Sequence, residues 1–418
     1  MTYKKEGKNM KFIHTSDLHI GIRLYEKGRE EEFRNFFRWL IDIINEEKVD
    51  LLLISGDIFD VVLPSNEARK IYYEFLADLN SSYCKDIIIT SGNHDSPLFL
   101  GASKKILDCL NIKIVSEITE NIEDEIVEIR DDLGNLTAIV CAVPYLREKD
   151  ISNIKVGNNA NEQNMVYVKS VSEHYKKIVD KALEIRKDLD IPIIAMGHLF
   201  SSEFLEADEK MEDGSRIISI LGNSVSIPPN TFSYDIDYLA LGHIHQPMPI
   251  SKDNKMFRYS GAPLRLGFGE PSNKSISLIQ SKGKELDLKL IPVPIFHNMT
   301  RIVGDLSVIL DKLSELKENN ADDYLEIVFK GSENIVDVKT KIDDISENAS
   351  YTILKLKTEL DNLTTNKTDL ENFTVDSLTD DVDGIFELCI KDKNEEDKEI
   401  LRRAYREAVE LLFKDESC

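Results

Sequence analysis

An aspartate and a histidine stand two residues apart near the start of the chain, in the segment MKFIHTSDLHIG. The apolar run before Asp17 and His19 is typical of a β-strand. Alternate side chains of a strand point to the same side, so these two can converge on one point beyond the strand's end. A carboxylate and an imidazole placed in this way can bind a metal ion. Asp and His are also common at the start of ordinary loops, so this pair alone leaves both interpretations open.

The same arrangement recurs along the chain. Four further apolar runs end in a small residue that is followed directly by Asp, Asn or His: VDLLLISGDIFD, DIIITSGNHD, IPIIAMGHLF and IDYLALGHIHQP. With the first run, they supply these candidate functional residues: Asp17, His19, Asp57, Asn93, His94, His198, His243 and His245. Only His14, His174 and His297 of the eight histidines lie outside this set. Unrelated turn chemistry is therefore a poor explanation for the five motifs.

The chemistry of these side chains favours a metal centre. Oxygen and imidazole ligands without a thiolate suit manganese, iron or zinc in sites that keep open positions, and they do not suit a closed structural zinc site. Seven ligands of this kind, one fewer than the eight candidates, are enough for two ions that share one carboxylate. The glycines that precede the motifs fit sharp turns in which the backbone comes close to the ions. These glycines are Gly56, Gly92, Gly197 and Gly242.

Amphipathic segments separate the apolar runs and predict the elements that position the motifs. Helical periodicity is present over Glu30–Glu47, Asn66–Leu79, Ser96–Leu110 and Val166–Arg186. Apolar strands that alternate with such helices, and that are apolar on both faces, predict a layered α/β domain. Functional residues of such folds collect outside the strand ends, which is where the five motifs lie.

Composition limits the class of protein. The chain has 418 residues, of which 42% are hydrophobic and 31% charged, so we expect a globular protein of two or three domains. Neither a membrane span nor a signal peptide is recognisable, and we expect a cytoplasmic protein without membrane contact. The five scattered cysteines contain no C-x-x-C pair, which predicts reduced thiols.

The net charge of −24 is unusual for a protein that binds nucleic acid by itself. A local basic groove, bound divalent cations or a partner subunit would have to supply the positive surface. A solvated acidic surface without any binding role is the simple alternative.

The ordered motifs D-x-H, GD, GNHD, GH and GHxH resemble those of the calcineurin-like metallophosphoesterases. Within that superfamily, MKFIHTSDLHIG, GDIFD, SGNHDSP, GHIHQP and YSGAPLRLGFGE resemble the SbcD family, the nuclease subunits of bacterial SbcCD complexes. The resemblance is strong over residues 10–270 and weaker after them. It implies an α/β fold, a layered metallophosphoesterase β-sandwich flanked by helices, for residues 10–290.

The resemblance also implies how the candidate residues divide. Two divalent ions, expected to be Mn²⁺, would be bridged by Asp57. The other ligands would be Asp17, His19 and His245 for the first ion, and Asn93, His198 and His243 for the second. His94 would face the phosphate and stabilise charge on it or on the leaving oxygen, with Asp95 orienting its ring. Archaeal relatives carry a histidine shortly after the GD motif, whereas this chain has Asp60, to which no role is assigned.

The function that the resemblance implies is a manganese-dependent DNA nuclease. It would act as a 3′–5′ exonuclease on double strands and as an endonuclease on single strands and hairpins. Two cations about 3.5–4 Å apart can bind a phosphate, acidify a water and stabilise the departing oxygen. The alternatives are another two-metal phosphatase and a non-catalytic scaffold on the same fold. The long segment after residue 270 argues against the first, and the complete ligand set against the second.

The implied partners are DNA and an SMC-like ATPase of the SbcC type, in DNA end processing, repair, recombination and replication. Homodimerisation within a heterotetramer would pair the helices Asn66–Leu79 and Ser96–Leu110. Their apolar side chains include Ile71, Tyr72, Phe75, Leu98, Phe99 and Leu100. Packing inside the chain is nearly as good an explanation of these residues.

The C-terminal third has a different pattern. From residue 300 to 357 we expect strand, helix (306–316), strand, helix (335–345) and strand. This module, residues 295–360, corresponds in position to a capping domain that shapes the DNA path, although it can also serve only for packing. Residues 361–393 are polar and predict a linker. The pattern of residues 394–418 predicts an amphipathic helix. Its apolar face would bind the ATPase or, alternatively, the chain's own surface.

Overall fold

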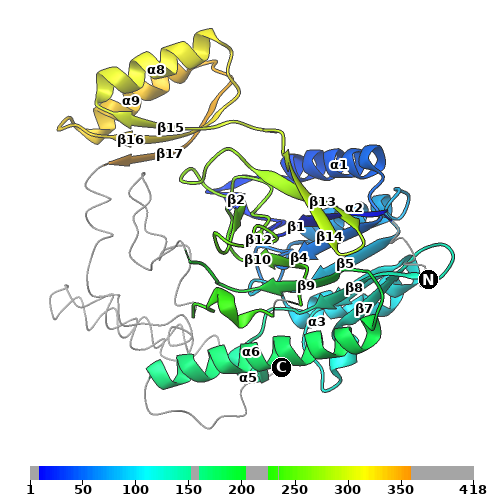
Figure 1. Cartoon of the computed structure of the whole chain (residues 1–418). Coiled ribbons are helices and arrows are strands. Elements are labelled where there is room, and N and C mark those ends of the chain that lie inside the picture. The colour runs from blue at the N-terminus through cyan, green and yellow to red at the C-terminus, as the bar shows by residue number, and fades with distance from the viewer. Residues whose placement is uncertain (1–8, 152–159, 204–224, 234, 359–418) are drawn as a thin grey trace, which may run out of the picture. The chain divides into compact units, whose positions relative to one another are not determined.

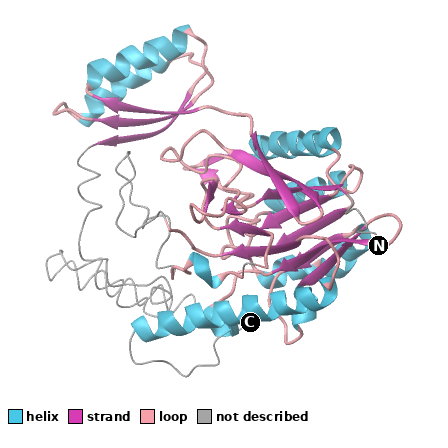
Figure 2. Cartoon of the chain, in the orientation of Figure 1, coloured by secondary structure: helices cyan, strands magenta, loops and turns pink. Residues whose placement is uncertain are grey.

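The computed structural model describes residues 9–151, 160–203, 225–233 and 235–358. Within them, two six-stranded sheets pack face to face, and helices cover their outer faces (Figures 1 and 2). The layered α/β sandwich expected from the sequence is therefore confirmed. No helix in these ranges is long and apolar enough to cross a membrane.

The first sheet has the strand order β14-β13-β1-β4-β5-β6. Its strands are β1 (Asn9–Thr15), β4 (Leu51–Ser55), β5 (Asp86–Thr90), β6 (Ile112–Val115), β13 (Ser275–Lys282) and β14 (Glu285–Pro292). Strands β1, β4, β5 and β6 run parallel, and β13 and β14 add an antiparallel hairpin. Leu51 and Leu53 of β4 face the second sheet, whereas Leu52 and Ile54 pack under the helices. This alternation explains why residues 51–54 of the strand are all apolar.

The second sheet repeats this plan, with the strand order β11-β12-β10-β9-β8-β7. Its strands are β7 (Ile126–Arg130), β8 (Leu136–Ala142), β9 (Ile193–His198), β10 (Tyr238–Gly242), β11 (Met248–Pro249) and β12 (Phe257–Tyr259). Strands β8, β9, β10 and β12 are parallel, and β7 and β11 are antiparallel edges. Ile194 and Met196 of β9 face the first sheet, so both sheets contribute to one central core.

Helices cover both sheets. They are α1 (Glu30–Glu47), α2 (Asn66–Leu79), α3 (Pro97–Ala102), α4 (Lys104–Leu107), α5 (Glu148–Ile151) and α6 (Ala160–Arg186), with short 3-10 turns η1 (Asp108–Leu110), η2 (Ile122–Glu125) and η3 (Pro229–Thr231). The first two have the predicted bounds. The single helix expected over residues 96–110 is instead broken at Ser103 into α3, α4 and η1. Gly101 and Ser103 are weak helix formers, which explains the break.

The apolar residues of α2 and α3 divide between the core and the surface. Ile71, Tyr72, Phe75 and Leu100 are buried in the core of the chain itself. Leu98, by contrast, has 82% of its surface exposed. Internal packing therefore accounts for most of the residues that the sequence offered for dimer contacts.

A second, smaller module follows the sandwich. Its strands β15 (Met299–Gly304), β16 (Tyr324–Phe329) and β17 (Thr352–Thr358) form a sheet packed against α8 (Leu306–Glu318) and α9 (Ile335–Ser346). The order strand, helix, strand, helix, strand is the one expected from the sequence. The module has its own apolar core, which includes Ile309, Leu313 and Ile327. The predicted linker, 361–393, and the predicted partner-binding helix, 394–418, lie outside the described residues.

Candidate metal centre

All five motifs lie at or just beyond the C-terminal ends of strands β1, β4, β5, β9 and β10. The loops after β1 and β4 run side by side: the Asp17 N–H donates to the Gly56 carbonyl at 3.0 Å, and the His19 N–H donates to the Asp57 carbonyl at 3.0 Å. The His243 N–H, from the second sheet, donates to Asp17 Oδ1 at 2.7 Å. Backbone hydrogen bonds therefore join the two loops of the first sheet, and the Asp17 side chain joins them to the second sheet.

The backbone adopts an unusual conformation at these residues. Asp17, His19, Asp57 and His243 have positive φ angles of 52°, 47°, 50° and 99°. Non-glycine residues rarely adopt this region, and such strain persists only where the surroundings enforce it, often at functional sites. Its presence at four motif residues supports a functional role for these loops.

Two glycines leave room for the candidate ligands. A Cβ atom at Gly56, whose φ is +80°, would lie 2.2 Å from His198 Nδ1, and one at Gly92 would lie 2.1 Å from Asp57 Oδ1. Both distances are far inside van der Waals contact. The glycines therefore let the backbone approach the side chains of two candidate ligands, His198 and Asp57.

Asp17, His19 and His245 form the first candidate group. One donor atom from each lies within 4.8 Å of the others. His19 is 2% exposed, and its Nε2 has no hydrogen-bond partner among the described residues. A buried nitrogen of this kind calls for a partner, because an unsatisfied polar atom is costly. A metal ion would satisfy it.

Asn93, His198 and His243 form the second candidate group. Asn93 Oδ1 lies 3.0 Å from His198 Nε2 and 3.1 Å from His243 Nδ1. Asp57 Oδ2 lies 3.2 Å from His198 Nε2 and 3.5 Å from His19 Nε2, so it reaches both groups. Ligands bound to one ion at about 2.0–2.2 Å stand roughly 3–3.5 Å apart. The observed separations fit two ions that share Asp57.

Neighbouring oxygens fix the tautomers of two of the histidines. His198 Nδ1 donates to the Ser55 carbonyl at 3.0 Å, and His19 Nδ1 lies 3.2 Å from Asp60 Oδ1. Both rings therefore present Nε2 toward Asp57. Carboxylates and carbonyls commonly orient metal-binding histidines in this way. Asp60, to which the sequence assigned no role, is thus placed to orient His19.

The electrostatics favour a cation beside Asp57. Burial lowers the pKa of His198, but the carboxylates of Asp57 and Asp17 outweigh it and raise that pKa to about 9. Although burial raises the pKa of Asp57, His198 and His19 hold it well below its usual range. Burial and the neighbouring His198 lower the pKa of His243 to about 3, which keeps that ring neutral. A neutral imidazole and an ionised carboxylate are the forms that bind metals.

His94 is exposed beside the two groups. Its Nδ1 donates to the Asp60 carbonyl at 2.8 Å, and its backbone N–H donates to Asp57 Oδ1 at 2.9 Å. The ring centroid lies 4.9 Å from that of His19. The ring therefore borders the candidate centre while its other nitrogen, Nε2, stays available to a substrate.

Asp95 does not make the contact expected from the sequence. Its buried carboxylate accepts the backbone N–H groups of Ile58, Phe59 and Gly92 at 3.1, 3.0 and 2.8 Å. Asp95 thereby joins the loop after β4 to the loop after β5. The role that the sequence gave to Asp95, orienting the His94 ring, is filled by the Asp60 carbonyl. Asp95 supports the centre through the backbone.

Glu270 was not among the residues selected from the sequence. Its Oε1 lies 3.0 Å from His245 Nδ1. The signal that could have identified it is its place at the end of YSGAPLRLGFGE, a motif used for the resemblance but not examined for individual side chains.

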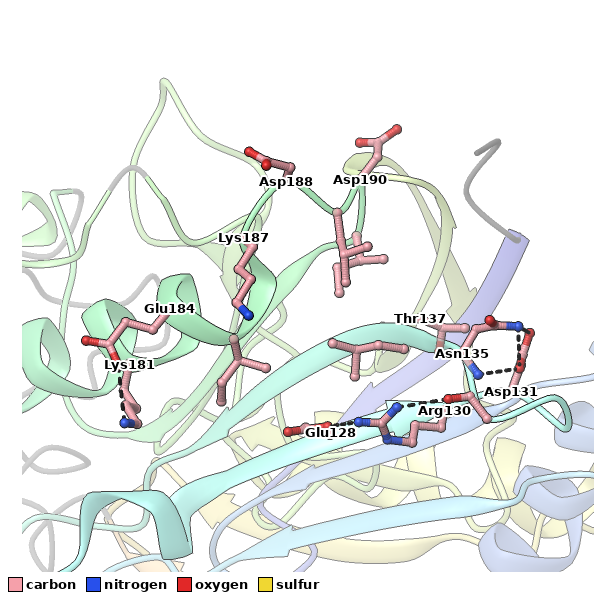
Figure 3. Close-up of a pocket in the computed structure, with 15 residues that line it drawn as sticks. Glu128, Arg130, Asp131, Asn135, Thr137, Lys181, Glu184, Lys187, Asp188 and Asp190 are labelled. Carbon is pink, nitrogen blue, oxygen red and sulfur yellow. Dashed lines mark hydrogen bonds and ion pairs between the residues drawn. The ribbon is translucent and has the colours of Figure 1, made fainter. Parts of the chain in front are cut away.

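A hollow of about 1080 Å³ lies elsewhere, beside β7, β8 and the end of α6 (Figure 3). Its charged side chains largely satisfy one another: Lys181 pairs with Glu184 at 3.2 Å, and Arg130 pairs with Glu128. Its lining, as far as the described residues show, contains no histidine. The hollow therefore lacks the chemistry of the metal centre.

Comparisons with known proteins identify the family of the chain. A family model described as calcineurin-like phosphoesterase matches residues 10–247, and one described as type 5 capsule protein repressor C-terminal domain matches residues 295–394. The SbcD subunit of nuclease SbcCD from Escherichia coli K12 is 31% identical over 352 residues, which cover 83% of this chain and 85% of the relative. The chain belongs to the SbcD family of calcineurin-like phosphoesterases.

Other SbcD relatives are similar. The Rhodobacter capsulatus protein is 33% identical over 267 residues, covering 62% of this chain and 64% of the relative. The Bacillus subtilis protein is 28% identical over 326 residues, covering 76% and 79%. As an SbcD protein, the chain is a phosphodiesterase of a family that implies divalent metal ions, and the donor groups described above fit such ions.

Proposed function

We propose that this SbcD protein is a manganese-dependent DNA nuclease, with 3′–5′ exonuclease activity on double strands and endonuclease activity on single strands and hairpins. The observation that carries the proposal is the pair of donor groups that share Asp57 beside the exposed ring of His94. A pair of divalent ions bound by these groups would supply Lewis-acid chemistry: polarisation of the phosphate and a water activated as nucleophile.

The candidate residues divide the remaining work. Asp17, His19 and His245 would hold one ion, and Asn93, His198 and His243 would hold the other, with Asp57 shared between the two groups. Asn93 adds a ligand without neutralising charge, which leaves the centre positive toward an anionic phosphate. With its Nδ1 proton on the Asp60 carbonyl, His94 can carry a second proton on Nε2 and donate it to the departing oxygen.

The donor set supports manganese, although it would also suit iron or zinc. Carboxylate, amide and imidazole ligands without a thiolate suit Mn²⁺ in a site that stays open to substrate. The net charge of −24 does not prevent phosphate binding, because the phosphate would bind where two such ions make the local charge positive.

We assign residues 10–290 to the nuclease domain and residues 295–360 to a capping domain. Contacts between the two support a capping role. The hairpin of β2 (Arg23–Leu24) and β3 (Lys27–Gly28) follows the His19 loop, and Tyr25 at its turn donates a hydrogen bond to Glu326 of β16. Lys355 and Lys357 of β17 lie 5.8 and 5.7 Å from the Tyr25 ring. The capping sheet therefore contacts a loop that leads directly from a metal ligand.

The proposed partner is an SbcC-type ATPase in DNA end processing, repair and recombination. The apolar face of residues 394–418 would bind it, with 361–393 as the linker, and the ATPase would supply basic surface for DNA. We also propose a homodimer within a heterotetramer. Exposed apolar side chains support it: Leu63, Leu98 and Ile106 have 83%, 82% and 72% of their surface exposed.

The experiment that tests this function compares three substrates with the purified chain in Mn²⁺. They are a DNA duplex, a small chromogenic phosphodiester and a phosphomonoester. We expect cleavage of DNA and of the diester that is lost when Mn²⁺ is chelated. A preference for the monoester would indicate a phosphatase, and inactivity on all three with Mn²⁺ bound would indicate a scaffold.

A further inference from the structure

Two histidines of the candidate metal centre have a carboxylate beside their Nδ1 atom. His19 has Asp60, and His245 has Glu270, whose Oε1 lies 3.0 Å from His245 Nδ1. An ionised carboxylate can only accept a hydrogen bond, so the Nδ1 of His245 carries the proton. The lone pair of the ring is then on Nε2, the nitrogen left for an ion.

Glu270 is held firmly in this position. Its side chain is 15% exposed, and its Oε2 accepts hydrogen bonds from Lys274 Nζ at 2.7 Å and from the Leu266 N–H at 3.0 Å. Lys274, whose side chain is only 3% exposed, also donates to the carbonyl of His245 at 2.9 Å. The ring, its own carbonyl and the carboxylate thus belong to one closed network.

The loop that carries Glu270 is fixed independently. Arg265 donates to the carbonyl of Phe268 at 3.0 Å and to the carbonyl of Met299 at 2.8 Å, and the Ala262 N–H donates to the His245 carbonyl at 3.2 Å. The carboxylate therefore reaches His245 from a braced segment. A freely moving side chain could not hold the ring in one orientation.

We propose that Glu270 is a positioning residue for His245, and that Lys274 holds Glu270 in place for this task. Glu270 fixes the tautomer and direction of the ring and increases its electron donation to the first ion. A carboxylate partner of a metal-binding histidine commonly contributes 10- to 100-fold in metal affinity. The inference rests on the proposed metal centre, and it adds a residue outside the ligand set.

The effect should be confined to the first ion. Around the second ion, His198 is oriented by the Ser55 carbonyl and not by a carboxylate, and its Nδ1 lies 3.0 Å from that oxygen. Removing Glu270 leaves this contact and the Asp57 bridge unchanged. A two-site metal titration can therefore separate a positioning role from general damage.

The test is calorimetric titration of the metal-free full chain with Mn²⁺. We expect Glu270→Ala to bind one of two ions about 10- to 100-fold more weakly and the other as the wild type does. Glu270→Gln, which keeps the volume and an accepting oxygen, should show a smaller loss, as should Lys274→Met, which releases the carboxylate. These two variants keep the test decisive if Glu270→Ala fails to fold.

Glu125→Gln is the matched control. Glu125 is buried and forms the same kind of pair, with Oε2 2.7 Å from His174 Nε2, between η2 and α6. This variant removes a buried imidazole–carboxylate pair without touching a candidate ligand. It should bind both ions normally, even if its melting temperature falls.

His245→Ala, titrated in parallel, separates the two levels of the inference. If His245→Ala loses an ion while Glu270→Ala and Glu270→Gln bind both ions like the wild type, the positioning role is wrong and the metal centre stands. If His245→Ala itself keeps both ions at full affinity, the metal centre is wrong as well. An equal loss in the Glu125→Gln control would assign the effect to general destabilisation and would also overturn the positioning role.

Discussion

The replacement His94→Gln separates catalysis from metal binding. In the structure, the side chain is exposed, and its Nδ1 makes one hydrogen bond, to the Asp60 carbonyl at 2.8 Å. Its contact with Asp57 is made by the backbone N–H, which glutamine retains. The variant therefore loses a proton donor at Nε2 and little else.

The expected magnitude follows from this role. Removing one donor that stabilises the transition state commonly lowers turnover by about 10²- to 10³-fold, which corresponds to about 2.7–4 kcal/mol. The stability cost should be about 1 kcal/mol or less, because only one hydrogen bond near the surface is lost. The assay is single-turnover cleavage of a short DNA duplex at saturating Mn²⁺, with bound metal and DNA affinity measured on the same preparation.

A loss of metal binding in His94→Gln is the alternative result. His94 lies with His19 and Asp60 in a group whose donor atoms are within 4.8 Å of one another, so the geometry also permits a third set of ligands. If His94→Gln loses Mn²⁺ in proportion to its activity, His94 is a ligand and the assigned role is wrong. A full rate with both ions bound would show that the ring does not contribute to the chemistry.

Three other predictions address different parts of the chain. Burial and Arg258 lower the pKa of His14 to about 3, from 6.5 when exposed, so the unfolded state binds the proton first as the pH falls below 6.5. A shifted pKa changes the free energy of unfolding by about 1.4 kcal/mol per pH unit, so urea unfolding should show that this free energy falls by about 2 kcal/mol between pH 6.5 and 5. His14→Gln should not show this fall. Equal pH dependence of stability in the wild type and the variant would contradict the assignment. Leu98→Glu combined with Ile106→Glu should convert the proposed dimer to a monomer, because burying a charge in an apolar contact is costly. Light scattering measures the oligomeric state, and a variant that stays dimeric would place the interface elsewhere. Deletion after Asn394 should abolish co-purification with the ATPase and leave Mn²⁺-dependent cleavage of single-stranded DNA intact, and undiminished binding would show that this segment does not recruit the partner.

The fold, and the convergence of the candidate ligands on one site, could be predicted because both depend on local patterns. Strand-ending motifs and helical periodicity located the loops that carry Asp57 and Asn93, and helices such as Glu30–Glu47 have the expected bounds. The family was recognisable from the same motifs.

Other features depend on tertiary contacts that periodicity does not encode. The partner of a ring can lie far along the chain, as Glu270 does from His245, so only the folded backbone shows that they meet. The same holds for Asp95, whose three backbone contacts replaced the expected one to His94. An apolar helical stripe does not say what it faces, which is why Phe75 was a candidate for a dimer contact and is buried within the chain.

The most direct test of the central claim is the Mn²⁺ stoichiometry of Asp57→Asn beside the wild type. After dialysis against micromolar Mn²⁺, we expect two ions per wild-type chain and the loss of both from the variant, because Asp57 Oδ2 reaches both donor groups. Circular dichroism should show that the variant is folded. Retention of one ion at wild-type affinity would mean that Asp57 serves a single ion, and retention of both would contradict the shared-carboxylate centre.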